Sequence, residues 1–241
     1  MLTDEMIENN KQEFLSLVKS ISRENSNLDA LCNWLEYSDF FVAPASVKYH
    51  AAYKGGLCAH SLNVYRNLVN LIYDWGMQDT MDADTPKILG LLHDLSKINT
   101  YKLDIRNKKI YSETGSKRDD MGRFDWKSVP EYAHRDDTNK FIYANHESTS
   151  EYYIRQFIPL SYVESIAIIH HHGNMSWDSM QDNIGSVWNA YPISLLLYQA
   201  DCQAAFINEN TYGNNFSYVQ DRTKLVPNKE ESEEVENEST N

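Results

Sequence analysis

Cysteine and long apolar runs are both scarce in this chain of 241 residues. Its three cysteines, Cys32, Cys58 and Cys202, form no CxxC pair. This argues against a disulfide framework or a thiolate zinc site and favours reduced thiols in a cytoplasmic protein. No apolar run approaches the ~18 residues of a membrane span, and the acidic N-terminus does not resemble a signal peptide. We therefore expect no association with a membrane.

Positive charge is also scarce, with 22 Lys and Arg against 35 Asp and Glu and a formal net charge of −13. The segment 226–241 holds six Glu and one Lys, so it carries −5 and leaves −8 for the rest of the chain. Proteins that bind duplex nucleic acid usually present basic stripes, so the acidic charge of this chain argues against extended duplex nucleic acid as a partner. A nucleotide or short oligonucleotide remains compatible with this charge. The Glu-rich segment predicts a disordered acidic tail after a single domain over residues 1–225.

Apolar residues with helical spacing occupy most of the chain. Their spacing predicts a long helix over 57–75. Asp84-Thr85-Pro86 is typical of a helix start, Ser161 and Glu164 match a capping box, and Pro192 opens the last strong helix. These signals predict an all-α bundle.

One stretch departs from the helical pattern. Tyr101, Leu103 and Ile105 alternate with charged residues, and residues 124–132 have the composition of a partner strand. This predicts a small β-hairpin inserted at about residues 100–133. Because the hairpin lies between candidate ligands in the sequence, it is either a lid or an insertion without function. The predicted fold class is thus an all-α helical bundle with a small inserted β-hairpin.

Histidine and aspartate recur in several of the predicted helices. His93 and Asp94 are adjacent in an apolar segment, and Asp201 follows the apolar run 195–200, where a buried carboxylate needs a partner or a metal. A helix presents only one or two side chains to a given point, so ligands scattered over several helices indicate a metal site between them. The candidates are His60, His93, Asp94, His146, His171 and Asp201.

Imidazole and carboxylate ligands suit one or two ions of Fe, Mn, Co, Ni or Zn, and Mg is also compatible. Each residue alone has an ordinary alternative. His60 fits a hydrogen-bonded core histidine, Asp201 fits an ion-pair partner, and the triplet His170–His172 fits a polar helix end. Only their joint occurrence indicates a metal site.

The order His, His-Asp, His and Asp between His50 and Ile207 resembles the HD-domain superfamily of metal-dependent phosphohydrolases. The segment from His50 to His60 resembles the one before the first ligand in bacterial HD hydrolases and HD-type exoribonucleases. The segment from His93 to Lys97 resembles the family motif His-Asp-x-x-Lys. Residues 39–46 and 60–65 are similar to uncharacterised HD hydrolases of bacteria and their phages.

The resemblance implies an HD-domain bundle with a four-ligand core of His60, His93, Asp94 and Asp201. It further implies that His146 and His171 complete a binuclear site bridged by Asp94. His172 is an additional candidate ligand, because His171-His172-Gly173 fits a motif of binuclear phosphodiesterases, whereas the more similar hydrolases have Met in place of the second His.

The implied activity is hydrolysis of a phosphate ester or phosphodiester of a nucleotide or short oligonucleotide by a metal-activated water. Asp94 and Lys97 would be catalytic, and the expected substrate contacts are His50, Tyr53, Arg123 and Trp126. Two alternatives stay open. One is a di-iron oxygenase of the same fold, such as myo-inositol oxygenase, and the other is a non-catalytic, metal-stabilised binding module.

Overall fold

The computed structural model describes residues 2–135, 145–173 and 183–209. The expected acidic tail, 226–241, lies outside these residues. Within them, 54% of the residues are helical and 15% lie in strands. The helices are α1 (Asp4–Lys19), α2 (Leu28–Tyr37), α3 (Gly56–Asp74), α4 (Thr85–Leu92), α5 (His146–Arg155), α6 (Tyr162–Ile169), α7 (Ile184–Ala190) and α8 (Pro192–Gln203). Short helical turns are η1 (Gln78–Thr80), η2 (Leu95–Lys97) and the π-helical η5 (Ala204–Asn208).

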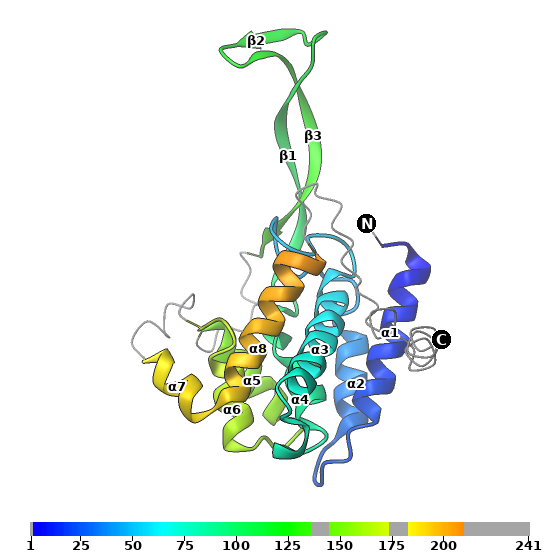
Figure 1. Cartoon of the computed structure of the whole chain (residues 1–241). Helices are drawn as coiled ribbons and strands as arrows, with labels where there is room; N and C mark the ends of the chain where they lie inside the picture. Colours follow the sequence, from blue (N-terminus) through cyan, green and yellow to red (C-terminus); the bar gives the residue numbers. More distant parts are fainter. Residues whose placement is uncertain (1, 136–144, 174–182, 210–241) are drawn as a thin grey trace, which may run out of the picture.

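The helical body is built around α3, which packs against both α4 and α8 (Figure 1). Gly90 allows the close approach of α3 and α4, because a Cβ at this position would lie 2.5 Å from the Tyr65 Cα. At Gly56, the first residue of α3, a Cβ would lie only 2.0 Å from the carbonyl oxygen of Ala51. These contacts hold the N-terminal half of α3 against α4. The expected ligand His60 lies in this half of α3, and His93 lies at the C-terminal end of α4. Within the described part of the chain, no helix is long and apolar enough to cross a membrane.

The prediction of an all-α fold with a small hairpin is wrong, because the fold is mixed α/β, although mostly helical. A three-stranded antiparallel sheet of order β1-β3-β2 contains β1 (Tyr101–Tyr111), β2 (Lys117–Asp119) and β3 (Gly122–His134). β1 and β3 pair without interruption from Tyr101↔His134 to Tyr111↔Phe124. The alternation 101–105 located the start of this sheet. The expected bounds of about 100–133 agree with the span from β1 to β3, but the short third strand β2, which consists of charged residues, was not expected.

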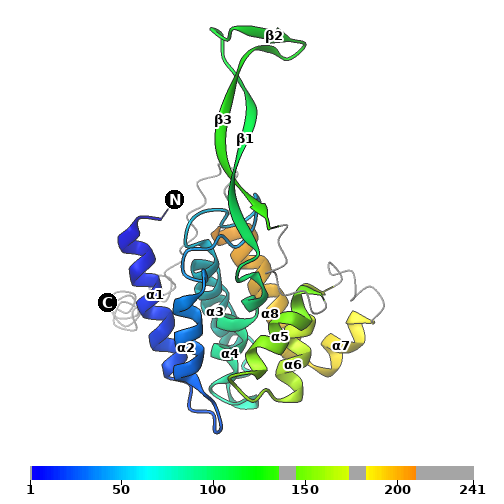
Figure 2. The ribbon, with the colours of Figure 1, turned by 180° about the vertical axis from the view of Figure 1, so that it is seen from behind.

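The paired strands β1 and β3 form a ribbon that projects from one end of the helical body, with β2 at its far end (Figures 1 and 2). After Tyr101, every residue of β1 is exposed. The ribbon therefore points away from the body and does not cover it as a lid.

A buried carboxylate links three segments at the opposite end of the body. Glu164 accepts hydrogen bonds from Arg23 Nη1 at 2.5 Å and Thr85 Oγ1 at 2.7 Å. It also closes the predicted capping box by accepting from the Ser161 backbone N–H at 2.8 Å. Burial opposes ionisation, but Arg23 and the other donors lower the pKa of Glu164. The ionised carboxylate is therefore the form that joins α4, α6 and the loop after α1.

Glu164→Gln is expected to lower the free energy of unfolding by about 2 kcal/mol at neutral pH, because Arg23 loses its buried counter-charge. A depressed pKa contributes stability above the ordinary pKa of Glu, and this contribution is lost as the pH falls through the folded-state value. The difference between the variant and the parent should therefore shrink on acidification. Urea denaturation of chelator-treated protein at neutral and acidic pH measures it, and a difference that grows in acid would contradict the assignment.

Candidate metal centre

All six expected ligands lie around one point in the helical body. α3 carries His60, the end of α4 carries His93 and Asp94, and α8 carries Asp201. His146 is the first residue of α5, and His171 follows the C-cap of α6. Helix α6 ends at Ile169, so the triplet lies in the turn after the helix rather than within it.

Asp94 is at the centre of the group. Its Oδ2 lies 3.4 Å from His60 Nε2 and 3.5 Å from His93 Nε2. Its Oδ1 lies 2.8 Å from His146 Nε2 and 3.7 Å from His171 Nε2. The two carboxylate oxygens thus face two different sets of imidazoles.

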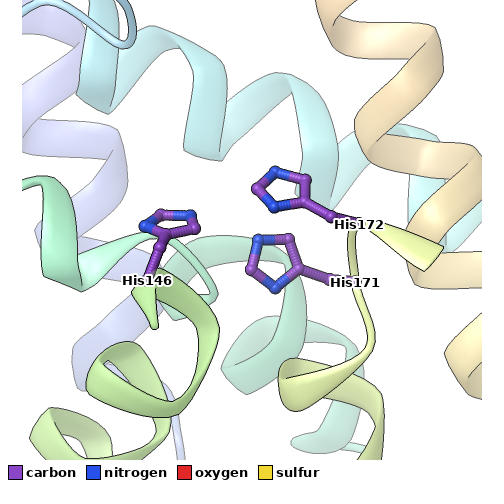
Figure 3. A group of neighbouring side chains, drawn as sticks. All are labelled: His146, His171 and His172. Carbon is purple, nitrogen blue, oxygen red and sulfur yellow. The ribbon is translucent and has the colours of Figure 1, made fainter. Parts of the chain in front are cut away.

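Two of the overlapping groups of potential ligands flank a third, which is made of His93, Asp94 and His171. His60, His93 and Asp201 form one, in which His60 Nε2 and Asp201 Oδ1 are 3.1 Å apart. His146, His171 and His172 form the other, and Figure 3 shows their rings gathered around a common space. Within each group the ligand atoms lie within 4.8 Å of one another. This spacing suits one metal ion per group.

The imidazoles are oriented by hydrogen bonds at their other nitrogen. His93 Nδ1 lies 3.1 Å from the Gly90 carbonyl, and His171 Nδ1 lies 2.6 Å from the Ile168 carbonyl. Because a carbonyl can only accept, both Nδ1 atoms carry the proton, and both Nε2 lone pairs point into the site. This is the arrangement in which histidine binds a metal through Nε2.

The site contains buried polar atoms that the described residues leave unsatisfied. Nε2 of His60, His93, His146 and His171 and both oxygens of Asp94 make no hydrogen bond of regular geometry. Only the Oδ2 of Asp94 has a close cation, the ammonium of Lys97 at 2.6 Å. Unsatisfied buried groups are costly, and converging imidazole lone pairs are satisfied by a cation. The residues present therefore fit a bound metal.

The protonation of the site also suits a cation. Burial lowers the pKa of His93 to about 3 and lowers that of His146 as well. Burial opposes ionisation of Asp94, but Lys97 and His93 hold the pKa of its carboxyl well below the usual range. Burial opposes protonation of His60 and His171, but neighbouring carboxylates raise the pKa of both, so these two imidazoles would release a proton when a metal binds. Neutral imidazoles and an ionised carboxylate are the forms that coordinate metals.

Two carboxylates outside the expected set of site residues orient His60 and His172. Glu209 Oε2 lies 3.0 Å from His60 Nδ1, and Asn63 Nδ2 donates to Glu209 Oε1 at 2.9 Å. Glu147 Oε1 lies 2.8 Å from His172 Nδ1. Both glutamates are buried. Glu147 follows a candidate ligand directly, whereas Glu209 reaches His60 through the π-helical turn η5, which no sequence pattern indicated.

Glu209→Gln is expected to weaken metal binding about 10- to 100-fold, because the carboxylate that orients and polarises His60 is lost. Titration of chelator-treated protein with Mn²⁺ or Zn²⁺, followed by calorimetry, measures the change. Glu13→Gln is a matched control, since Glu13 is an exposed residue of α1 that forms an ion pair with Arg66 of α3, away from the centre. Equal affinity in Glu209→Gln and in the parent protein would contradict this role.

The four expected substrate contacts lie in two different places. The His50 ring lies 4.9 Å from the His60 ring, and its Nε2 is buried without a hydrogen bond. Burial lowers the pKa of His50 to about 4 and raises that of nearby Tyr53 to about 12. Both side chains are therefore neutral near pH 7, which suits them as hydrogen-bonding groups beside the centre.

Arg123 and Trp126 instead lie far along the ribbon. Trp126 pairs with Lys109, eight residues beyond Tyr101, which corresponds to about 27 Å of strand. Arg123 is still farther out, opposite Arg118 of β2. A nucleotide bound at the centre does not extend that far.

Comparisons with protein-family models, with curated proteins and with solved structures find no match. The functional assignment therefore depends on the chemistry of the site. Within the described residues, buried groups of His, Asp and Glu are arranged so that they can hold a metal ion.

Proposed function

We propose that this protein is a metal-dependent phosphohydrolase of the HD type that acts on a nucleotide or short oligonucleotide. The observation that carries the proposal is the position of Asp94 between two imidazole groups, with one carboxylate oxygen toward each. This arrangement supports a binuclear centre of His60, His93 and Asp201 on one side and His146, His171 and His172 on the other, bridged by Asp94.

Lys97 favours phosphoryl chemistry at this centre. Its ammonium is 2.6 Å from Asp94 Oδ2 and almost fully buried. Burial opposes its protonation, but Asp94 outweighs this effect and raises the pKa of Lys97. A permanent positive charge beside the centre would fix the Asp94 carboxylate and neutralise the charge that develops on a phosphate in the transition state.

A bound divalent metal would supply an activated water at neutral pH and polarise a phosphate oxygen. The protein's own groups would then position the substrate. Neutral His50 beside His60 can hydrogen-bond a substrate oxygen, and Tyr53 supplies a hydroxyl that stays protonated. Asp94 remains ionised throughout, so it can hold the attacking water by accepting a hydrogen bond.

The di-iron oxygenase alternative needs the same ligands, so an experiment must separate the two. Protein purified without added metal is analysed for its elements and then assayed, after loading with Mn²⁺ or Fe²⁺, against nucleoside mono- and triphosphates, cyclic nucleotides and short oligonucleotides. About two metals per chain with release of phosphate or nucleotide supports the proposal. Oxygen consumption with a mixed-valent iron signal would favour the oxygenase. Protein that takes up no metal would exclude both the phosphohydrolase and the oxygenase.

Lys97→Met is expected to lower kcat of the hydrolysis about 100-fold while metal content stays near that of the parent protein. The side chain of Met fills a similar volume but carries no charge, so the phosphate loses its neutralising partner. Steady-state kinetics together with elemental analysis measures both quantities. Lys87→Met is a control, because Lys87 forms an ion pair with Asp84 on the same helix as His93 but outside the centre. Unchanged kcat in Lys97→Met would exclude Lys97 from catalysis.

A further inference from the structure

The ribbon formed by β1 and β3 has one apolar face and one charged face. Residues directly opposite each other in an antiparallel pair share a face, and alternate residues along a strand point to opposite sides. The register places the pairs Leu103↔Tyr132 and Ile105↔Pro130 on the same side as Lys109↔Trp126 and Tyr111↔Phe124. We call this side the apolar ribbon face. The opposite side is mostly charged: it carries Lys102, Asp104, Arg106, Lys108, Asp125, Lys127 and Glu131, together with the apolar residues Ile110, Val129 and Ala133.

The apolar ribbon face is largely exposed, except for Phe124 at its far end, which is buried against Tyr111, Trp126 and Lys109. Ile105 is 73% exposed, Leu103 64% and Trp126 51%. Among the described residues only the base of the ribbon packs against the body, where Tyr101 and Ala133 are buried. Large apolar side chains occur on the pairs either side of the polar pair Asn107↔Ser128. Apolar side chains gathered on one face, rather than scattered singly, are characteristic of an interaction surface.

The free energy of forming the ribbon alone is also unfavourable or close to zero. An isolated two-stranded ribbon is marginally stable in water, because it orders its backbone without burying a face. This one extends about 36 Å over the eleven residues of β1. A second layer on the apolar ribbon face would supply the missing burial.

The distribution of net charge along the chain indicates which kind of partner can cover the apolar ribbon face. Residues 101–134 contain eight Lys and Arg and six Asp and Glu, so the ribbon carries +2 and the rest of the chain −15. The acidic remainder disfavours approach to a nucleic acid or an anionic membrane. It also disfavours contact between two bodies, whereas two ribbons can meet without bringing the bodies together.

We propose that the apolar ribbon face is the dimer interface of this protein, with two copies stacking their ribbons face to face in antiparallel orientation about a two-fold axis. An apolar face of this kind is self-complementary, as a two-fold interface requires. The axis passes near Asn107↔Ser128, the middle pair of the face. Leu103 and Ile105 of one copy then lie against Tyr111 and Trp126 of the other, and the charged faces stay in water.

The available area predicts a dimer of moderate affinity. The face is about 27 Å long from Leu103 to Tyr111 and two strands wide, so each copy would bury on the order of 500 Å². This is below the ~800 Å² per partner of a standard interface and typical of weaker complexes. We therefore expect a dimer that dissociates on dilution in the micromolar range.

Sedimentation velocity of the full chain over about 1 to 200 μM tests the interface, and Ile105→Lys is expected to weaken dimerisation at least about tenfold. Asp104→Lys is the matched control, since it places the same side chain one residue away on the charged face. Both positions are exposed, so neither variant should unfold, and circular dichroism checks this. A dimer that survives in Ile105→Lys, or a parent chain that is monomeric throughout, would overturn the proposal.

A cross-linking experiment tests the arrangement within the dimer. Asn107→Cys should be joined efficiently between copies by a bis-maleimide about 10 Å long, the spacing of two stacked sheets. Lys108→Cys, on the charged face, should not. Equal cross-linking at both positions would overturn the face-to-face arrangement. If the parent is monomeric but binds neutral lipid vesicles or a single-stranded oligonucleotide through Ile105, the face belongs to that ligand and the dimer is excluded.

Discussion

Asp94→Asn is expected to lower hydrolysis of the preferred phosphate ester by about a thousandfold or more. Asn offers one neutral oxygen where Asp94 now presents a charged oxygen to each imidazole group. A bridge between two cations needs both oxygens and the negative charge, so metal content should also fall. Elemental analysis and steady-state kinetics on the same preparation measure the two effects together.

The control must separate loss of metal from loss of fold, because Asp94→Asn leaves the buried Lys97 ammonium without its counter-charge. The double variant Asp94→Asn/Lys97→Met removes that charge as well and should recover most of the stability but none of the activity. Asp104→Asn on the exposed ribbon should behave like the parent protein. Full activity with full metal content in Asp94→Asn would end the binuclear proposal.

Removal of metal is the second large effect, and we expect a chelator to lower the melting temperature by about 10 °C. Bound metal stabilises the folded state by about 4 kcal/mol when its free concentration is 1,000 times its Kd, and each kcal/mol shifts Tm by about 2–4 °C in a domain of this size. The physical reason is the set of imidazole nitrogens and Asp94 oxygens that are buried and unsatisfied without a cation.

Differential scanning calorimetry before and after treatment with EDTA, with metal content measured in both samples, checks the expectation. Re-addition of Mn²⁺ or Zn²⁺ should restore the parent melting temperature. Asp94→Asn is the control, since a variant that does not bind metal should show little response to the chelator. A parent protein that loses all its metal without any change in Tm would contradict a centre that is coupled to folding.

Much of the site could be predicted from the sequence because its ligands have an unusual chemistry for their surroundings. His93 and Asp94 follow an apolar helix, and Asp201 lies in another, so each would be costly to bury without a partner. Helical spacing then placed these segments on separate helices, which the structure brings together at one point. The starts of α4 and α6 could also be predicted, since Pro86 and the Ser161–Glu164 capping box mark them directly.

The rest could not be predicted because it depends on tertiary contacts without a local signal. Glu209 orients His60 across most of the chain, and nothing near Glu209 in the sequence distinguishes it from a surface glutamate. The third strand of the sheet was missed for a different reason. β2 contains only the three charged residues Lys117–Asp119, so no apolar alternation marks it in the sequence.

The contact between His60 and Glu209 also constrains how the protein folds. The two residues are 149 positions apart, and Asp201, another candidate ligand, lies near the end of the described chain as well. Contacts of such long sequence separation require closure of large loops and therefore form slowly. During synthesis α3 emerges long before α8. His60 therefore lacks its carboxylate partners, Asp201 and Glu209, until the later part of the chain has been made. The complete centre can assemble only as one of the last events of folding. Metal binding would then occur only after the helical body has folded, so it could serve as a measure of complete folding.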